Sequence, residues 1–113
     1  MIHLNIGSNL DSKYGTKFDN ISIAINLLLN AQVKIHKISN FYETPSYPNR
    51  KLPKFLNVGL TIAYENEKLD LLKEIKLIEK KIGRIKTKKN DPRIIDIDII
   101  DFNSEIKNSD SLV

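Results

Sequence analysis

The sequence predicts an α+β fold in which one antiparallel sheet carries two helices on the same face. Segments with strand and helix patterns follow one another in the order β-α-β-β-α-β. Right-handed crossovers between strands of one sheet place both helices on one side of it. The 113 residues are enough for one hydrophobic core but not for two. We therefore expect a single domain over residues 1–113.

Four segments have the alternation or the β-branched composition of strands. They are Ile2 to Ile6, Val33 to Tyr42, Phe55 to Tyr64 and Ile94 to Phe102. In the third segment, side chains that alternate along the strand place Leu56, Val58, Leu60 and Ile62 on one face. Asn57 falls on the other face. Asparagine is a poor strand former, so Asn57 is either an amide that faces a ligand or a sheet-edge residue that meets water.

Two segments have the 3.6-residue apolar spacing of helices. The first runs from about Tyr14 to Asn30, and its apolar positions are Phe18, Ile21, Ala24, Ile25, Leu28 and Leu29. The second follows Asn66, a plausible N-cap. Its apolar positions are Leu69, Leu72, Ile75, Ile78 and Ile82, and Gly83 ends it with the residue expected at a left-handed C-cap. The resulting order is that of the split β-α-β, ferredoxin-like folds.

The last predicted strand carries two carboxylates on one face. Asp96 and Asp98 point one way, and Ile95, Ile97 and Ile99 point the other. Residues two apart on a strand are separated by roughly 7 Å, and a cation between the carboxylates relieves their repulsion. Mg²⁺ prefers a few carboxylate oxygens and leaves its other positions to water and phosphates. An isolated Asp-x-Asp is more often a solvated polar face, and that alternative stays open here.

A cluster of cations precedes the acidic strand. Seven basic residues stand between positions 80 and 93, against one acid, Asp91. They are Lys80, Lys81, Arg84, Lys86, Lys88, Lys89 and Arg93. Such a run attracts phosphate, either in a nucleic acid or in a small nucleotide. A cation cluster beside a metal-binding acid pair favours a nucleotide-phosphate site.

A proline-rich segment runs from Thr44 to Lys54 and holds three prolines. Proline lacks a backbone N–H and restricts the residue before it, so regular structure is not expected there. Loops of this length in a compact domain are usually functional or mobile. A plain surface connection between two strands is the alternative.

Composition excludes several classes of protein. There are no cysteines, which rules out disulfides and thiolate chemistry. No apolar run approaches the ~18 residues of a membrane span, and the first residues do not resemble a secretory signal. We therefore expect a cytoplasmic protein without a membrane partner.

Several motifs together resemble the 6-hydroxymethyl-7,8-dihydropterin pyrophosphokinases of folate biosynthesis. They are Ile6-Gly7-Ser8-Asn9-Leu10, Phe41-Tyr42-Glu43-Thr44-Pro45, Phe55-Leu56-Asn57, Glu79 with Gly83-Arg84, and Pro92-Arg93-Ile94-Ile95-Asp96-Ile97-Asp98-Ile99. They cover nearly the whole chain in the right order. The family also has a ferredoxin-like fold, in agreement with the order of elements above.

The resemblance implies an enzyme that transfers pyrophosphate from ATP to 6-hydroxymethyl-7,8-dihydropterin and releases AMP. It implies two Mg²⁺ ions bound by Asp96 and Asp98. The implied catalytic residues are Arg84, Arg93, Lys86 and Lys89, and the implied ATP-binding residues are Glu79, Arg84, Arg93 and Ile99. The arginines would clamp phosphate with their planar forks, whereas the two lysines stand where the family often has arginine.

For the pterin, the resemblance implies contacts from Thr44, Tyr47, Phe55 and Asn57. Thr44 and Asn57 would hydrogen-bond the heterocycle, and Phe55 would stack on it. Tyr47, in the proline-rich segment, would help to close the site.

The sequence departs from the family in two places. Asn90-Asp91 replaces the usual Trp-Gly before the Pro-Arg pair, so an aromatic that covers the pterin is missing. The family also continues past Val113 with a Pro-His segment and an arginine-aromatic segment. We therefore expect a further C-terminal segment in the natural protein, and the resemblance allows fusion to, or succession by, dihydropteroate synthase.

Two other classes of function remain as alternatives. A ferredoxin-like RNA-binding module would use aromatics on its central strands, but the first strand has none, and the acid pair would repel a nucleic-acid backbone. We therefore expect no nucleic-acid partner. A non-catalytic nucleotide-binding domain would bind Mg²⁺ and nucleotide without turnover.

Overall fold

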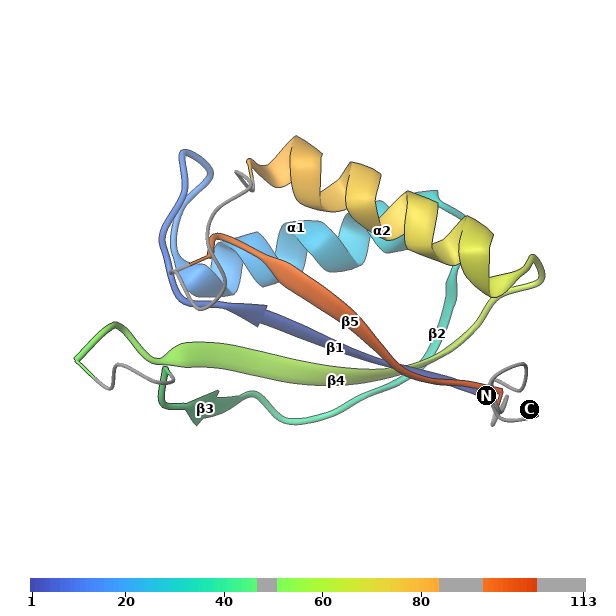
Figure 1. Cartoon of the computed structure of the whole chain (residues 1–113), viewed down its shortest axis with the longest axis horizontal. Helices are drawn as coiled ribbons and strands as arrows, with labels where there is room; N and C mark the ends of the chain where they lie inside the picture. The colour runs from blue at the N-terminus through green and yellow to red at the C-terminus, as the bar shows by residue number, and fades with distance from the viewer. Residues whose placement is uncertain (47–50, 84–92, 104–113) are drawn as a thin grey trace, which may run out of the picture.

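The computed structural model describes residues 1–46, 51–83 and 93–103, and the statements below concern those residues. The elements are β1 (Ile2–Ser8), α1 (Lys17–Asn30), β2 (Lys34–Ile38), β3 (Tyr42–Thr44), β4 (Phe55–Ala63), α2 (Lys68–Ile82) and β5 (Asp96–Phe102). The strands form one antiparallel sheet in the order β2-β4-β1-β5, with β3 also paired to β4. Both helices cover the same face of the sheet (Figure 1). The predicted fold class is confirmed.

The core lies between the sheet and the helices and follows the alternation of the strands. Every second residue of β1 faces inward, and Ile2, Leu4 and Ile6 are at most 2% exposed. Val58, Leu60 and Ile62 of β4 are buried beside them, as predicted. Full burial of such a side chain stabilises a fold by about 1.5–3 kcal/mol. The opposite, outer face of the sheet is left to the polar residues of the same strands.

The second predicted strand, residues 33–42, is wrong as a single strand, because the structure divides it into β2 and β3. Ser39 lies between them, and its hydroxyl accepts a hydrogen bond of 2.8 Å from the Gly59 backbone N–H. A side chain that takes over a ladder hydrogen bond interrupts the regular pairing. A register shift between Ile35 and Lys37 bends the same segment.

The helix beginnings also differ from the prediction, because capping decides them. Helix α1 starts after Thr16, not at Tyr14. The Asp19 backbone N–H donates to Thr16 Oγ1 (3.3 Å), and the Thr16 N–H donates to Asp19 Oδ2 (2.8 Å), which is a capping box. For α2 the N-cap is Glu67, whose N–H donates to Asp70 Oδ2 (3.2 Å), and not the predicted Asn66. Neither of these two helices is long and apolar enough to cross a membrane.

The apolar faces of the helices are predicted only in part. Phe18, Leu29 and Leu69 are 52%, 49% and 61% exposed. Leu69 stands six residues before the buried Ile75, which places it about 120° away around the helix, and Leu71 is buried instead. Phe18 packs on Phe41 outside the core, with ring centroids 5.1 Å apart.

Strand ends shift because pairing, not composition, limits them. Strand β1 continues past Ile6 to Ser8, β4 stops at Ala63 rather than residue 64, and β5 begins at Asp96 rather than residue 94. Between β1 and β5, Leu4 pairs with Ile99 and His3 pairs with Asp101, so Ile100 is left over in β5 and bulges outward.

Gly83 ends α2 with φ of +116°, as its C-cap role predicts. Gly83→Ala should lower the free energy of unfolding by about 1–2 kcal/mol, because a Cβ is strained in the left-handed region. Gly83→Asn is the matched variant, since asparagine tolerates that region, and should lose less than half as much. Urea denaturation measures both. Equal losses would show that the backbone conformation is not the cause.

Candidate functional site

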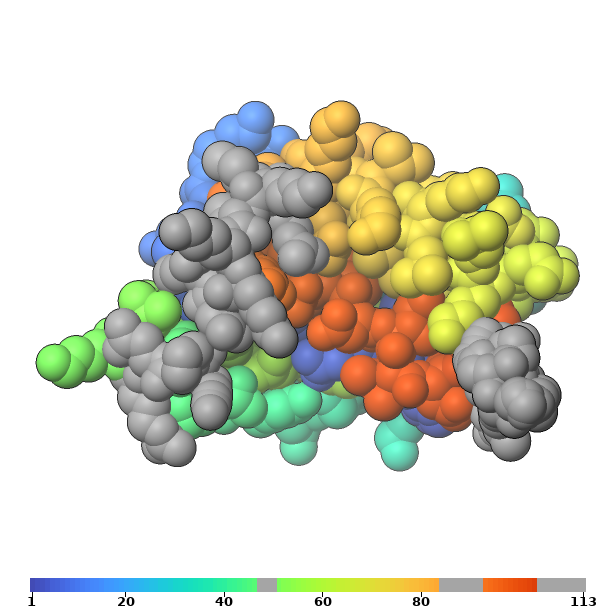
Figure 2. All heavy atoms as spheres, viewed as in Figure 1, coloured from blue at the N-terminus to red at the C-terminus, as the bar shows by residue number. Residues whose placement is uncertain are grey.

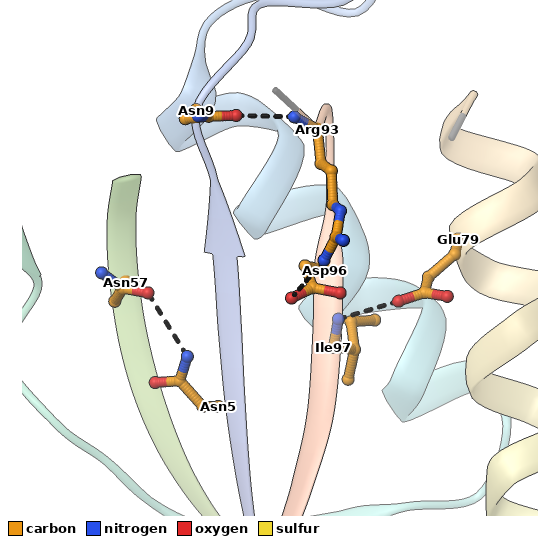
Figure 3. A network of polar contacts seen from close by, with 7 residues as sticks. All are labelled: Asn5, Asn9, Asn57, Glu79, Arg93, Asp96 and Ile97. Atoms are coloured by element: carbon orange, nitrogen blue, oxygen red, sulfur yellow. Dashed lines mark hydrogen bonds and ion pairs between the residues drawn. The ribbon is translucent and has the colours of Figure 1, made fainter. Parts of the chain in front are cut away.

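The outer face of the sheet brings the predicted metal and pterin residues into adjacent rows. Gly7 of β1 pairs with Asp96 on one side and with Asn57 on the other, and Asn5 pairs with Asp98 and Gly59. The carboxylates of β5 and the amide of β4 are therefore separated by one strand, at a backbone distance of roughly 10 Å. Figure 3 shows Asp96 on β5 and Asn57 on β4, with β1 between the two strands. Strand β5 also reaches the surface beside α2 (Figure 2).

The two acids of β5 face outward as predicted. Ile95 and Ile97 are 0% and 5% exposed, whereas Asp98 is exposed and the Asp96 side chain is 21% exposed. Among the described residues, no group of three or more His, Cys, Asp or Glu side chains lies close enough to hold a metal. Two carboxylates at the surface fit a hard cation that takes its other ligands from water or phosphate, as Mg²⁺ does.

Arg93 stands three residues before Asp96 and forms an ion pair with it. Its Nη1 atom lies 3.5 Å from Asp96 Oδ2, and its side chain is 23% exposed. This pair is partly solvated, so it contributes little to stability. It does hold a guanidinium, a group suited to binding anionic oxygens, at the edge of the acid pair.

Asn9 fixes the backbone of Arg93 and is a site residue that the sequence argument missed. The Arg93 N–H donates to Asn9 Oδ1 (2.6 Å), and the Asn9 N–H donates to the Arg93 carbonyl (3.0 Å). The Asn9 amide also donates to Ser46 Oγ (3.1 Å) and to the Pro53 carbonyl (3.2 Å). Asn9, which is 2% exposed, thus joins the end of β1 to the start of the acidic strand and to both sides of the proline-rich segment.

The predicted pterin residues Thr44, Phe55 and Asn57 lie together on β3 and β4. Asn57 is 7% exposed and lies within the sheet, so the alternative of a sheet-edge residue is wrong. Its Nδ2 donates to Thr44 Oγ1 (2.9 Å), and its Oδ1 accepts from Asn5 Nδ2 (3.3 Å). The Tyr42 hydroxyl in turn donates to Asn5 Oδ1 (2.8 Å). This chain of hydrogen bonds fixes which end of the Asn57 amide faces which neighbour.

Gly7 leaves the room that the Asn57 amide needs. A Cβ at Gly7 would lie 2.9 Å from Asn57 Oδ1 and 3.5 Å from a ring carbon of Phe55. The first distance is shorter than van der Waals contact, so a side chain at Gly7 would displace an amide that is already held at both ends.

Glu79 and Ile99, predicted to line a nucleotide site, lie on the helix side of β5. Glu79 is 6% exposed, and its Oε2 accepts a hydrogen bond of 2.8 Å from the Ile97 backbone N–H. Ile99 is partly buried and packs against the hydrophobic core. The other predicted site residues, Tyr47, Arg84, Lys86 and Lys89, lie outside the described residues.

Comparison with known proteins gives one family. The family model for 7,8-dihydro-6-hydroxymethylpterin-pyrophosphokinase matches residues 3–112. A folic acid synthesis protein of Dictyostelium discoideum is 38% identical over 112 residues, which are 99% of this chain and 16% of that protein. The bifunctional protein FolKE of Lactococcus lactis subsp. cremoris is 36% identical over 113 residues, 98% of this chain and 31% of that protein.

A shorter relative is the 2-amino-4-hydroxy-6-hydroxymethyldihydropteridine pyrophosphokinase of Aquifex aeolicus. It is 34% identical over 105 residues, 93% of this chain and 62% of that protein. The chain therefore spans less than two thirds of the length of each of these three relatives.

Asn9→Ala should lower the free energy of unfolding by about 2 kcal/mol, because it leaves buried partners without hydrogen bonds. The expected change is larger than that of Asn30→Ala, an exposed control at the end of α1 that should change stability by less than about 0.5 kcal/mol. Thermal denaturation of both variants measures the difference. Equal stabilities of the two variants would show that the hydrogen bonds of Asn9 do not stabilise the fold.

Proposed function

The chain belongs to the 7,8-dihydro-6-hydroxymethylpterin-pyrophosphokinase family, and on this premise we propose that it transfers pyrophosphate from ATP to 6-hydroxymethyl-7,8-dihydropterin. The hydroxymethyl oxygen would attack the β-phosphorus of ATP, the bond from that phosphorus to the α,β-bridging oxygen would break, and AMP would leave. The hydroxyl proton would pass to solvent. One observation carries the proposal: an outward acid pair on β5 and a fixed amide on β4 share one face of the sheet, one strand apart.

The protein itself has little covalent work in such a transfer, so positioning and charge stabilisation dominate. Asp96 and Asp98 would hold two Mg²⁺ ions, which supply neutralisation of the phosphate charge when bound. Arg93 would place its guanidinium against the same phosphates, because its backbone is held by Asn9 and its side chain lies at Asp96. We retain Arg84, Lys86 and Lys89 as further phosphate-binding residues, and Glu79 and Ile99 as ATP-binding residues at the edge of the nucleotide site, on the helix side of β5.

The pterin would lie over β3 and β4. An amide oxygen accepts two hydrogen bonds, so Asn57 Oδ1 retains capacity for a ring N–H beside its bond from Asn5. Thr44 Oγ1, which accepts from Asn57, would orient a second polar group of the ring. Phe55 would stack on the heterocycle, and Tyr47 would close over it.

We place this reaction in the cytoplasm, without nucleic-acid or membrane partners, and near or fused to dihydropteroate synthase. Support for a multifunctional setting comes from relatives that carry the names folic acid synthesis protein and bifunctional protein. A non-catalytic binding domain is the second candidate, and turnover distinguishes the two.

Asp96→Asn and Asp98→Asn should each lower pterin-dependent AMP formation by about a thousandfold. Charge stabilisation by a metal is worth several kcal/mol, and about 1.4 kcal/mol corresponds to a factor of ten in rate. The measurement is AMP release from ATP and Mg²⁺, with and without the pterin, on variants whose thermal denaturation shows an intact fold.

The matched control is Asp101→Asn. Asp101 lies on the same strand but pairs with His3, Nδ1 to Oδ2 3.6 Å, beyond the bulge. This variant should keep its rate within about twofold, as expected of a surface substitution. Full activity in either acid-pair variant would refute the metal assignment, and binding without AMP in the wild type would favour the non-catalytic candidate.

Gly7→Ala should raise KM for the pterin at least about tenfold, which is the effect of losing one hydrogen bond of about 1.4 kcal/mol, and should leave KM for ATP nearly unchanged. The reason is the 2.9 Å approach of the new Cβ to Asn57 Oδ1. Gly59→Ala is the control, because its Cβ would be 3.5 Å from Ser39 Oγ, an ordinary contact. Equal effects on both substrates would contradict a pterin site at Asn57.

A further inference from the structure

We propose that Glu79 is a positioning residue that holds the backbone between the two metal-binding acids and thereby sets their separation. The inference rests on the proposed function, because it gives Asp96 and Asp98 their metal. The role of Glu79 differs from that of a residue that lines the nucleotide site, because here Glu79 acts through a peptide group of β5.

The contact falls at one of the two peptides that link the acid pair. Glu79 Oε2 accepts from the backbone N–H of Ile97, the residue between Asp96 and Asp98, at 2.8 Å. That nitrogen belongs to the peptide joining Asp96 to Ile97, so a tilt of this peptide changes the direction of the Asp96 carboxylate relative to Asp98. Figure 3 shows Glu79 reaching from α2 to β5 on the side away from β1.

Strand β5 needs such a partner because it is an edge strand of the described sheet. Its other edge pairs with β1, where Ile97 lies opposite Ile6. Ile97 is 5% exposed, so water cannot readily take the place of Glu79 at its N–H. A buried backbone donor without an acceptor is costly, whether the acceptor it loses is charged or neutral.

The carboxylate pair is therefore held from two sides. Arg93 Nη1 lies 3.5 Å from the Asp96 side chain at the surface, and Glu79 holds the adjoining peptide from within the fold. Groups that orient metal ligands typically change metal affinity by roughly 10–100-fold when they are removed. Glu79 should act on metal binding in this way without touching the metal.

Two conservative variants separate this role from a role of the charge itself. Glu79→Gln keeps the length and the acceptor oxygen but loses the charge. Glu79→Asp keeps the charge but is one methylene shorter, so its oxygen cannot reach Ile97 without movement of α2. The same two changes at Glu74, which is half-buried on α2 and lines a separate hollow between the helices, serve as controls.

The first readout is hydrogen exchange of the Ile97 amide, measured by NMR on the protein without ligands. The second is the affinity for Mg²⁺ in the presence of α,β-methylene-ATP, measured by calorimetry. We expect Glu79→Asp to lower the protection of the Ile97 amide at least about tenfold and to weaken Mg²⁺ binding about 10–100-fold. Glu79→Gln should remain within about threefold of the wild type in both, and the Glu74 variants should change neither.

The reverse order, with Gln impaired and Asp close to the wild type, would overturn the proposal and assign the effect to the charge. Loss of amide protection without any change in Mg²⁺ affinity would also overturn it, since the hydrogen bond from Ile97 to Glu79 would then have no effect on the metal site. If the wild type binds no Mg²⁺ with the nucleotide, the proposed function fails, whereas the exchange data still decide whether Glu79 holds the strand.

Discussion

The pairing of β1 with β4 on one side and with β5 on the other is the constraint on which the site depends. It places Asp96, Gly7 and Asn57 in one row and Asp98, Asn5 and Gly59 in the next. Because side chains alternate along a strand, all of these face away from the helices. A slip of one residue would turn the acids into the core and the isoleucines outward. Burial of Ile95 and Ile97 therefore protects the register of the polar face.

Hydrogen bonds of asparagine and glutamate side chains hold the strands that carry this polar face. Asn9 hydrogen-bonds Arg93, just before β5, and also Ser46 and Pro53 of the proline-rich segment. Glu79 accepts a hydrogen bond from the Ile97 N–H at the edge of the sheet. Asn57 is held between Thr44 and Asn5. Each contact joins segments that are distant in the sequence and so fixes the positions of the strands relative to one another. Such preorganised geometry suits a reaction that depends on position and charge.

The fold and the face of the acids were predictable from the sequence because both follow from local periodicity. Val58, Leu60 and Ile62, and the alternation of Ile95 to Asp98, needed only the two-residue period of a strand. Features that depend on a particular side-chain contact were missed. The capping box of Thr16 and Asp19 makes α1 begin later than predicted, and the Ser39 hydroxyl interrupts the second predicted strand. Propensity alone does not reveal such contacts, since they compete with the regular hydrogen bonds.

The site residues show the same division. Their motifs identified Asp96, Asp98, Thr44 and Asn57 through the resemblance, but Asn9 appeared only as one residue of the Ile6–Leu10 motif, without a role of its own. Its partners Ser46, Pro53 and Arg93 lie 37 to 84 residues away, and no local pattern predicts that they meet. Glu79 was placed beside the nucleotide, whereas its bond to the Ile97 backbone could only be found in three dimensions.

We propose that the metal and the nucleotide bind on the outer face of β5, one strand from Asn57. Paramagnetic broadening of amide signals by Mn²⁺ with α,β-methylene-ATP tests it most directly. We expect the strongest broadening at residues 96–98 of β5 and the facing residues 5–7 of β1, weaker broadening at Asn57, and none at Leu77 on the outside of α2. Broadening centred on α2, or spread evenly over the surface, would contradict it.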